Sequence, residues 1–275
     1  MAEPAGCQPI RLHRDGVRLA DAEHRVAERQ ASGGGDPAVV LCARDVETQV
    51  GAQRGRLVVG HRQRSGFAGA ADRTTVVLDH TVEEHADEPA VHQAGRALID
   101  QREMFLDTKS WSNALKAALR EDPNVVLVGE MRDLETISSA MTIAETGHLV
   151  FATLHTNSAA QSVDRIIDVF PEVQQPQIRL QLASTLESII SLRLIPTVQP
   201  GRALATEVLF ATPAIKNIIR EGKTYLIDNV IETSAELGMQ VLESSLADLV
   251  KKGKISEDMA LRFAIRPELL EKLLK

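Results

Sequence analysis

The stretch from residue 125 to residue 156 contains two short apolar runs separated by a helical pattern. VVLV (125–128) and HLVFATLHT (148–156) are typical of buried strands, and LETISSAMTIAET between them has helical periodicity. Asp133 is the expected N-cap of this helix, and Gly147 is its expected end. Strands that are joined through a helix by short links run parallel, with a right-handed crossover. The sequence therefore predicts an α/β fold.

Further local patterns predict a strand pair followed by an α-helical C-terminal region. The pattern indicates helices over 107–122 and 176–194, the second with Ile178, Leu182, Leu186, Ile189 and Ile190 on one face. The runs 192–198 and 203–211 predict two strands around a turn. Residues 213–221 predict a helix with Thr212 as N-cap and Gly222 just past its end. We expect further helices over 223–233, 239–252 and 256–274, the last broken near Pro267.

A change of composition divides the chain near residue 98. Residues 1–100 contain twelve Arg and no Lys, whereas residues 101–275 contain ten Arg and nine Lys. Six of the eight His and both Cys also lie in the first part. Residues 1–90 show neither a helical stripe nor an alternation that predicts a core. We expect the N-terminal ~90 residues to be irregular or disordered, with candidate strands only at 56–60 and 74–79 and a candidate helix at 19–30.

Two explanations for this N-terminal part remain open. A GC-rich gene that is translated in a wrong reading frame yields a sequence that is rich in Arg, Ala, Gly and His but free of Lys. The alternative is a genuine, variable domain from a GC-rich genome. We favour a frameshift or chimera, because the Lys-containing remainder would share that genome. Translation of the encoding DNA in all six frames tests this hypothesis, which fails if no other frame extends the C-terminal pattern upstream.

Charge, hydropathy and cysteine usage argue against several classes of protein. The net charge of −7 argues against a nucleic-acid partner. No run approaches the ~20 apolar residues of a transmembrane segment, and the start of the chain lacks the apolar centre of a secretory signal. Cys7 and Cys42 have no CxxC spacing, so they indicate neither a disulfide framework nor a zinc site. These features are typical of a cytoplasmic protein.

Side chains that can perform chemistry lie at the ends of the two predicted strands. Glu130 and Arg132 follow the first strand, where an acid can face the magnesium ion of a bound nucleoside triphosphate. His148 and His155 flank the second strand. They start on opposite faces, so we expect no shared metal ion. Each of these residues, like Glu145 at the end of the helix, is by itself equally compatible with an ordinary surface position.

Together these segments resemble the secretion-ATPase superfamily, and most closely the retraction ATPases of type IV pili and twitching motility, the PilT family. LREDPNVVLVGEMRDLETI (119–137) is similar to the family's Walker B segment, and TGHLVFATLHTNSA (146–159) is similar to its histidine box. AIKNIIRE (214–221) resembles the C-terminal signature AIRNLIRE, and residues 238–256 continue the match. The signature, and the absence of a four-cysteine zinc segment, favour the retraction branch over the assembly branch. The resemblance covers about 98–275.

The resemblance implies an architecture and an assembly. It implies a P-loop NTPase core of the RecA-like type, here incomplete, followed by a C-terminal helical bundle. The chain then divides into an unassigned segment 1–97, a partial ATPase core 98–211 and a helical domain 212–275. The implied assembly is a homo-hexamer, or a mixed ring with an intact family member, that uses ATP and Mg²⁺. It would be cytoplasmic, peripheral at the inner membrane, with the pilus inner-membrane platform protein as a partner.

The resemblance also implies roles for individual residues. Glu130 would help to position magnesium and water, and His148 and His155 would contact the γ-phosphate and the neighbouring subunit. Arg132 and Glu145 would belong to the nucleotide site. The helix that carries the signature would be needed for pilus retraction but not for hydrolysis. Its functional residues would be Ala214, Ile215, Asn217, Ile219, Arg220 and Glu221.

Two motifs of the family are missing where they are expected. A GxxxxGK[ST] loop should precede the Walker B strand by about sixty residues or more, with its backbone N–H groups around the phosphates and its Lys neutralising them. Residues 1–108 contain no Lys, ASGGGDP (31–37) lacks the cation and the hydroxyl, and REGKTYL (220–226) lacks the first Gly. The family's aspartate box, EDPIE, is matched only faintly by ADEPAVHQ (86–93). Phe105 stands where the family commonly has Gly.

Three hypotheses follow. In the first, the chain is a truncated or frame-disrupted retraction-ATPase homologue that is inactive alone, since phosphoryl transfer depends on the missing phosphate cradle. In the second, it is a non-catalytic interaction module that joins and modulates rings of an intact paralogue. In the third, it is an active motor with an unrecognised phosphate loop. We favour the first. Binding of an ATP analogue would support the third, and co-purification with an intact family member would support the second.

Overall fold

The computed structural model describes residues 38–45, 55–61, 75–80, 98–103, 105–121 and 123–275. All of them belong to one unit, Pro37–Lys275. The candidate helix 19–30 and the stretches 31–37 and 86–93 lie outside the described residues.

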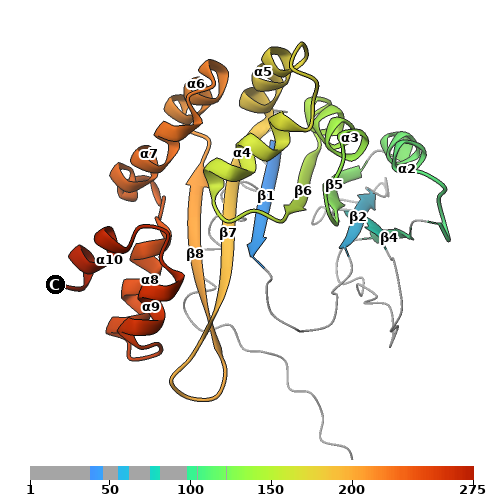
Figure 1. Ribbon diagram of the computed structural model, residues 1–275. Coiled ribbons are helices and arrows are strands. Elements are labelled where there is room, and N and C mark those ends of the chain that lie inside the picture. Colours follow the sequence, from blue (N-terminus) through green and yellow to red (C-terminus); the bar gives the residue numbers. More distant parts are fainter. Residues whose placement is uncertain (1–37, 46–54, 62–74, 81–97, 104, 122) are drawn as a thin grey trace, which may run out of the picture. The chain divides into compact units, whose positions relative to one another are not determined.

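The described strands form one mixed eight-stranded sheet in the order β2-β4-β3-β5-β6-β1-β7-β8 (Figure 1). They are β1 (Ala38–Asp45), β2 (Gly55–His61), β3 (Thr75–His80), β4 (Leu98–Glu103), β5 (Pro123–Val128), β6 (Leu149–Leu154), β7 (Leu186–Pro196) and β8 (Arg202–Phe210). The run β3, β5, β6, β1, β7 is parallel throughout. β8 is antiparallel to β7, and β2 is antiparallel to β3, β4 and β5. The candidate strands 56–60 and 74–79 are confirmed as β2 and β3, whereas β1 has no counterpart among the predicted strands.

Some helices connect the strands of this sheet in the sequence, and others come after its last strand. α2 (Trp111–Ala118), α3 (Leu134–Glu145), α4 (Ala159–Asp168) and α5 (Gln175–Thr185) lie in sequence between β4 and β7. α6 (Pro213–Glu221), α7 (Ile227–Thr233), α8 (Leu242–Lys251), α9 (Glu257–Phe263) and α10 (Pro267–Leu274) follow β8, and short 3-10 turns are η1 (Leu119–Glu121), η2 (Thr224–Leu226) and η3 (Ala235–Leu237). α3 contacts β6 and β1, α4 contacts β7 and β8, and α8 contacts β8. Figure 1 shows α8, α9 and α10 grouped beside β8.

Side-chain caps begin two helices where the sequence predicts them. Asp133 Oδ1 accepts a hydrogen bond from the Thr136 N–H at 2.9 Å and caps α3. Thr212 caps α6, and Gly222 ends α6 with φ 69°, the left-handed conformation that glycine adopts without steric cost. The expected break near Pro267 is confirmed, because α9 and α10 are separate helices. These signals are local, so they do not depend on tertiary packing.

The predicted helix over 176–194 is wrong beyond Thr185, because α5 ends there and Leu186 begins β7. Ile178 and Leu182 are buried on α5, as the helical pattern requires. β7 pairs with β1 on one side and with β8 on the other, and its residues are buried over most of its first half. Leu186, Ile189 and Ile190 have the spacing i, i+3 and i+4, which is also the spacing of a helical face. Over so short a stretch, periodicity alone does not separate a strand from a buried helix.

The buried apolar residues of the described part form two clusters. The larger cluster unites the sheet with α2 to α7 and includes Val128 of β5, Ile167 of α4 and Ile219 of α6. The smaller cluster joins the β7–β8 pair to α8, α9 and α10 and includes Ile195 and Leu246. α6 and α7 thus share a core with the sheet. The domain boundaries at residues 98 and 212 stay a prediction.

Candidate functional site

The candidate site lies at the carboxyl ends of β5, β6 and β1. The register places Val128 of β5 opposite Ala152 of β6, and Ala43 of β1 opposite Leu154 of β6. The strand order reverses at β1, since β3, β5 and β6 lie on one side of it and β7 lies on the other. In open α/β sheets, ligands bind outside the carboxyl ends of the strands at such a switch point. The loops after β5 and β6 are therefore the place to look for function.

Glu130 is the central side chain of this site. Its Oε1 lies 3.1 Å from His155 Nε2 and 2.5 Å from Arg132 Nε. The Glu130 side chain is 11% exposed, whereas those of His155 and Arg132 are 57% and 66% exposed. The hydrogen bond to Glu130 raises the pKa of the Arg132 guanidinium. The structure thus brings together three of the residues that the sequence singled out.

Two hydrogen bonds hold the loop that carries Glu130 against β6. Thr153 Oγ1 donates to the backbone oxygen of Gly129. The Met131 N–H donates to the backbone oxygen of Thr153 at 3.0 Å. Glu130 therefore lies between two residues that are fixed to the neighbouring strand, and its side chain projects from a defined backbone.

The segment that joins β6 to α4 is held by hydrogen bonds to the first turns of α4. Thr156 Oγ1 lies 2.7 Å from Ser162 Oγ, and the Asn157 N–H donates to Gln161 Oε1 at 3.1 Å. Ser158 is the N-cap of α4, and its Oγ accepts from the Gln161 N–H at 3.3 Å. The residues directly after His155 are thus held in place by hydrogen bonds to α4.

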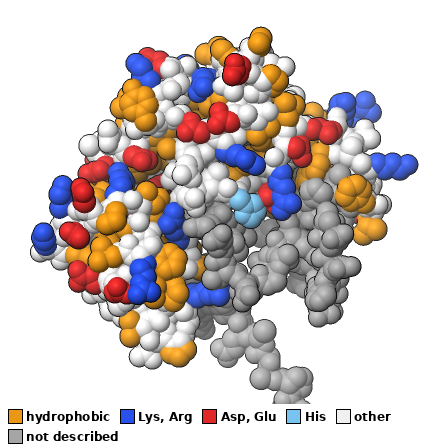
Figure 2. Space-filling view, in the orientation of Figure 1, with side chains coloured by type: hydrophobic (Ala, Val, Ile, Leu, Met, Phe, Trp, Pro, Cys, Tyr) orange, Lys and Arg blue, Asp and Glu red, His pale blue; other side chains and the backbone are white. Residues whose placement is uncertain are grey.

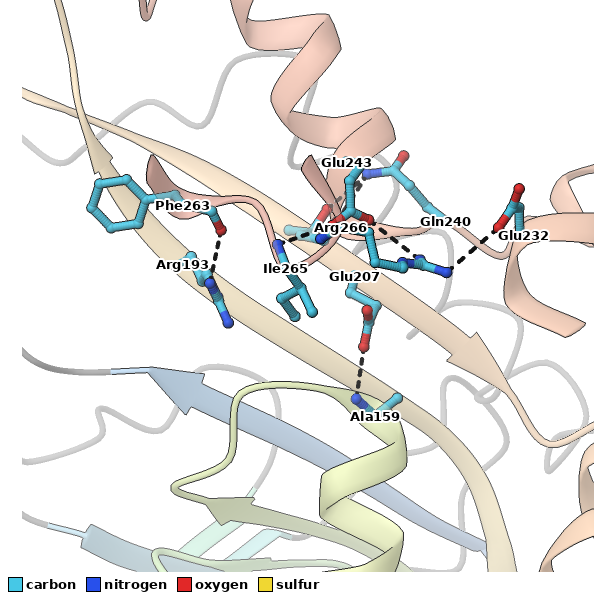
Figure 3. Close-up of polar contacts among 10 residues, drawn as sticks. Ala159, Arg193, Glu207, Glu232, Gln240, Glu243, Phe263, Ile265 and Arg266 are labelled. Carbon is cyan, nitrogen blue, oxygen red and sulfur yellow. Dashed lines mark hydrogen bonds and ion pairs between the residues drawn. The ribbon is translucent and has the colours of Figure 1, made fainter. Parts of the chain in front are cut away.

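Two further side chains, from β7 and β8, reach the same segment. Arg193 Nη2 donates to the backbone oxygen of Asn157 at 3.2 Å. Glu207 Oε1 accepts from the Ala159 N–H at 2.6 Å, as Figure 3 shows, and Glu207 is only 3% exposed. Sequence reasoning missed both residues. The alternation in 203–211 does place Glu207 on the apolar face of β8, which marks a buried acid, but no local signal distinguishes Arg193.

Burial raises the pKa of Glu207 to about 7. The hydrogen bond from the Ala159 N–H opposes this rise, because it stabilises the charged carboxylate. The negative charges of Asp228 and Glu243 raise the pKa further, and the positive charge of Arg266 lowers it. Glu207 therefore changes its charge near neutral pH while it contacts the first residue of α4.

His148 and Glu145 lie apart from this group, next to the other end of β6. His148 Nδ1 is 2.8 Å from Thr146 Oγ1 and 3.3 Å from the backbone oxygen of Ile143. Glu145 Oε2 accepts a hydrogen bond from Gln181 Nε2 at 3.4 Å. The two histidines of the motif thus flank β6 at opposite ends. Within the described residues, no group of His, Cys, Asp and Glu is arranged to hold a metal ion.

The side chains at this edge fit only part of a magnesium–nucleotide complex. Glu130 and His155 supply an acid and an imidazole, but the phosphates also require a cation and backbone N–H groups around them. The segment 46–54 after β1 lies outside the described residues, and its sequence VETQVGAQR contains no Lys. In the Gly-Lys-Thr at 222–224, Gly222 ends a helix, and Lys223 Nζ lies 2.7 Å from Glu221 Oε2. The described residues alone therefore do not fit MgATP.

α6 has one buried face and one exposed face. Ile215 and Ile219 are fully buried in the larger apolar cluster. The exposed residues of the predicted functional set are Ala214, Asn217, Arg220 and Glu221. Hydrogen bonds from Lys223 and Asn217 lower the pKa of the Glu221 carboxyl. The exposed face is thus polar and charged on a helix that the two isoleucines anchor.

The described surface carries mixed charge. On the face shown in Figure 2, acidic and basic side chains are interspersed. Among the described residues, no helix has the length and apolar character that a bilayer crossing requires.

Comparisons with known proteins give consistent results. A family model described as Type II/IV secretion system protein matches residues 63–208. The type IV pilus retraction ATPase PilT of Pseudomonas aeruginosa is 51% identical over 178 residues, which is 65% of this chain and 52% of that protein. The twitching motility protein of Neisseria gonorrhoeae is 50% identical over 179 residues, 65% of this chain and 48% of that protein. The chain thus spans about half the length of these curated relatives.

Solved structures support the same likeness. The crystal structure of the pilus retraction motor PilT with bound ADP superimposes with a TM-score of 0.66 at 35% sequence identity. The superposition covers 86% of this chain and 64% of that chain. The predicted class, a mixed α/β core of this ATPase type followed by helices, is confirmed.

Proposed function

Because the chain belongs to the Type II/IV secretion system protein family and has PilT-like relatives, we propose that it is a degenerate homologue of the pilus retraction ATPase that does not hydrolyse ATP alone. One observation carries the proposal. Glu130 contacts His155 at the carboxyl ends of β5 and β6, yet residues 1–108 contain no Lys for the phosphates. Phosphoryl transfer depends on positioning and on charge stabilisation. The described residues supply the acid and the imidazole but no phosphate-binding Lys, so we expect no hydrolysis by the chain alone.

The proposal assigns a role to each site residue within a complete ring. Glu130, Arg132 and His155 would lie on the side of the nucleotide site that faces Mg²⁺ and the γ-phosphate. Glu130 contacts the Arg132 guanidinium and the His155 imidazole through the same oxygen, which holds the three groups together. His148 and Glu145 lie next to the other end of β6. By resemblance, we assign His148 to contacts with the γ-phosphate and the neighbouring subunit, and Glu145 to the nucleotide site.

The assembly and location follow the resemblance. We propose that the chain forms a homo-hexamer, or a mixed ring with an intact family member, in the cytoplasm. Such a ring would bind peripherally at the inner membrane and contact the pilus platform protein. The exposed face of α6, formed by Ala214, Asn217, Arg220 and Glu221, would act in pilus retraction and not in hydrolysis.

A second candidate function is that of a non-catalytic module that joins and modulates rings of an intact paralogue. The well-formed ends and buried face of α6 favour this second candidate. The helix has its N-cap, its glycine end and its two buried isoleucines, so its exposed face is presented intact. An interaction surface of this kind does not need a phosphate cradle, which the described residues do not supply.

Phosphate release by the purified chain in MgATP tests the proposal. We expect no release above a blank, and no difference between the wild type and Glu130→Gln, which controls for contaminating ATPases. Turnover that Glu130→Gln abolishes would overturn the proposal. Gel filtration with the purified PilT of Pseudomonas aeruginosa then tests the second candidate. Co-elution of the two proteins would support a mixed ring, and separate elution would count against it.

A further inference from the structure

Arg193 of β7 binds two backbone segments that are far apart in the sequence. Its Nη1 donates to the backbone oxygen of Phe263 at 2.9 Å, at the end of α9 (Figure 3). Its Nη2 donates to the backbone oxygen of Asn157 at 3.2 Å, two residues after His155. A guanidinium is always charged and presents its donors in a rigid planar fork. One side chain therefore sets the spacing between the two carbonyl groups.

Glu243 of α8 also holds the backbone that follows Phe263. Glu243 Oε1 accepts from the Ile265 N–H at 3.1 Å and from the Arg266 N–H at 2.8 Å. Glu243 Oε2 lies 3.3 Å from Arg266 Nη2, and Glu243 is only 1% exposed. The turn between α9 and α10 is thus held by Arg193 on one side and by Glu243 on the other, as Figure 3 shows.

The Asn157 end lies in the segment that carries the site histidine. His155 contacts Glu130, Asn157 contacts Arg193, and Ala159 contacts Glu207, so alternate residues of this segment are held by different elements. Charge-assisted hydrogen bonds are about twice as strong as neutral ones. The two hydrogen bonds from Arg193 therefore form a direct, charge-assisted connection between this segment and the end of α9.

We infer that Arg193 is a positioning residue that couples the backbone after His155 to the turn between α9 and α10. A shift of either segment changes the other through the guanidinium. The coupling goes beyond the proposed function, because it is a property of the chain itself and requires no nucleotide. Coupling between two sites is reciprocal, so loosening the turn must loosen the segment after His155 as long as Arg193 is present.

Hydrogen exchange on the full chain, read by mass spectrometry, tests this coupling. Glu243→Gln loosens the turn directly, and we expect it to raise exchange at least about threefold in 156–159 as well as in 263–266. In the Arg193→Gln background, the same substitution should raise exchange only in 263–266. If the buried Glu243→Gln variant does not fold, Arg266→Gln, which removes the side-chain partner of Glu243, takes its place. Arg202→Gln, at an exposed position on β8, is the matched control and should change neither segment.

A spectroscopic readout separates positioning from a general loss of packing. In protein labelled with ¹³C-histidine and assigned through His155→Gln and His148→Gln, Arg193→Gln should shift the His155 signal and leave the His148 signal in place. Arg193→Lys keeps the charge but lacks the fork, and should restore the His155 signal only in part. Equal shifts of both histidines, or a Glu243→Gln effect on 156–159 that persists without Arg193, would overturn the inference.

Discussion

Glu130 and His155 follow neighbouring parallel strands, and their side chains meet at 3.1 Å between Oε1 and Nε2. The contact arises from the register, which places Val128 opposite Ala152 just before the two loops begin. Arg132 lies 2.5 Å from the same carboxylate oxygen. Glu130, whose side chain is 11% exposed, thus contacts an exposed guanidinium and an exposed imidazole at the edge of the sheet.

Glu130→Gln is expected to change the free energy of unfolding by less than about 1 kcal/mol, because ion pairs with exposed partners contribute little. Urea denaturation of both proteins measures the change, with Glu236→Gln, at an exposed position, as the control. A loss of several kcal/mol would show that Glu130 is a structural residue rather than one available for a ligand.

Glu207→Gln is expected to remove a fall in stability between about pH 4.5 and 7. The folded-state pKa of Glu207, about 7, lies above its ordinary value of 4.5. In this window the folded protein therefore holds a proton that the unfolded chain has released. The stabilisation is complete below the ordinary pKa and is lost as the pH rises through 7, by on the order of 3 kcal/mol at most.

Urea denaturation near pH 5 and near pH 8 compares the two proteins. The stability of Glu207→Gln relative to the wild type should increase between these two conditions, since the uncharged amide has no proton to lose. Glu236→Gln serves again as the exposed control. The same difference between Glu207→Gln and wild type at both pH values would contradict the raised pKa.

Phe105→Gly is expected to stabilise the protein by about 0.5–1 kcal/mol. Within the described residues, Phe105 is the non-glycine residue with a positive φ, 70°, which costs an L-residue about 1–2 kcal/mol. Its side chain is 68% exposed, so little packing is lost, and the greater freedom of glycine in the unfolded chain offsets part of the gain. Thermal and urea unfolding measure the effect. Leu106→Gly, at a 77% exposed neighbour without positive φ, should destabilise instead.

The two faces of α6 should respond differently to alanine. Ile219→Ala removes a fully buried side chain and is expected to cost about 2–5 kcal/mol of unfolding free energy. Arg220→Ala, next to it on the exposed face, should change stability by no more than about 0.5 kcal/mol. Urea denaturation of the matched pair measures both values. Similar losses for both variants would mean that the helix does not present Arg220 outward.

Several features of the fold could be predicted from the sequence because their causes are local. The caps at Asp133 and Thr212 and the glycine end at Gly222 depend on neighbouring residues only. The strand β7 could not, because the spacing of Leu186, Ile189 and Ile190 also fits a helical face, and their place in a strand depends on pairing with β1 and β8. β1 shows the same limit, since its place between β6 and β7 depends on pairing and not on its own pattern.

The residues of the candidate site likewise fall into those that the sequence could predict and those that it could not. Glu130, Arg132 and His155 lie in motifs, so the sequence singled them out, although their mutual contact depends on the register. The contacts of Arg193 and Glu207 could not be predicted, because their partners are backbone atoms of Asn157 and Ala159. Only the folded sheet brings these atoms close to the two side chains. Phe105, which stands where the family commonly has Gly, has a positive φ, a conformation that glycine adopts without steric cost.

Binding of a nucleotide by the isolated chain tests the central claim most directly. Titration of the purified full chain with a fluorescent ATP analogue, with and without Mg²⁺, should give no saturable binding, because residues 1–108 supply no lysine and the described residues supply no phosphate cradle. Micromolar binding that requires magnesium and is lost in Glu130→Gln would contradict the account, and would show that the chain holds a complete nucleotide site.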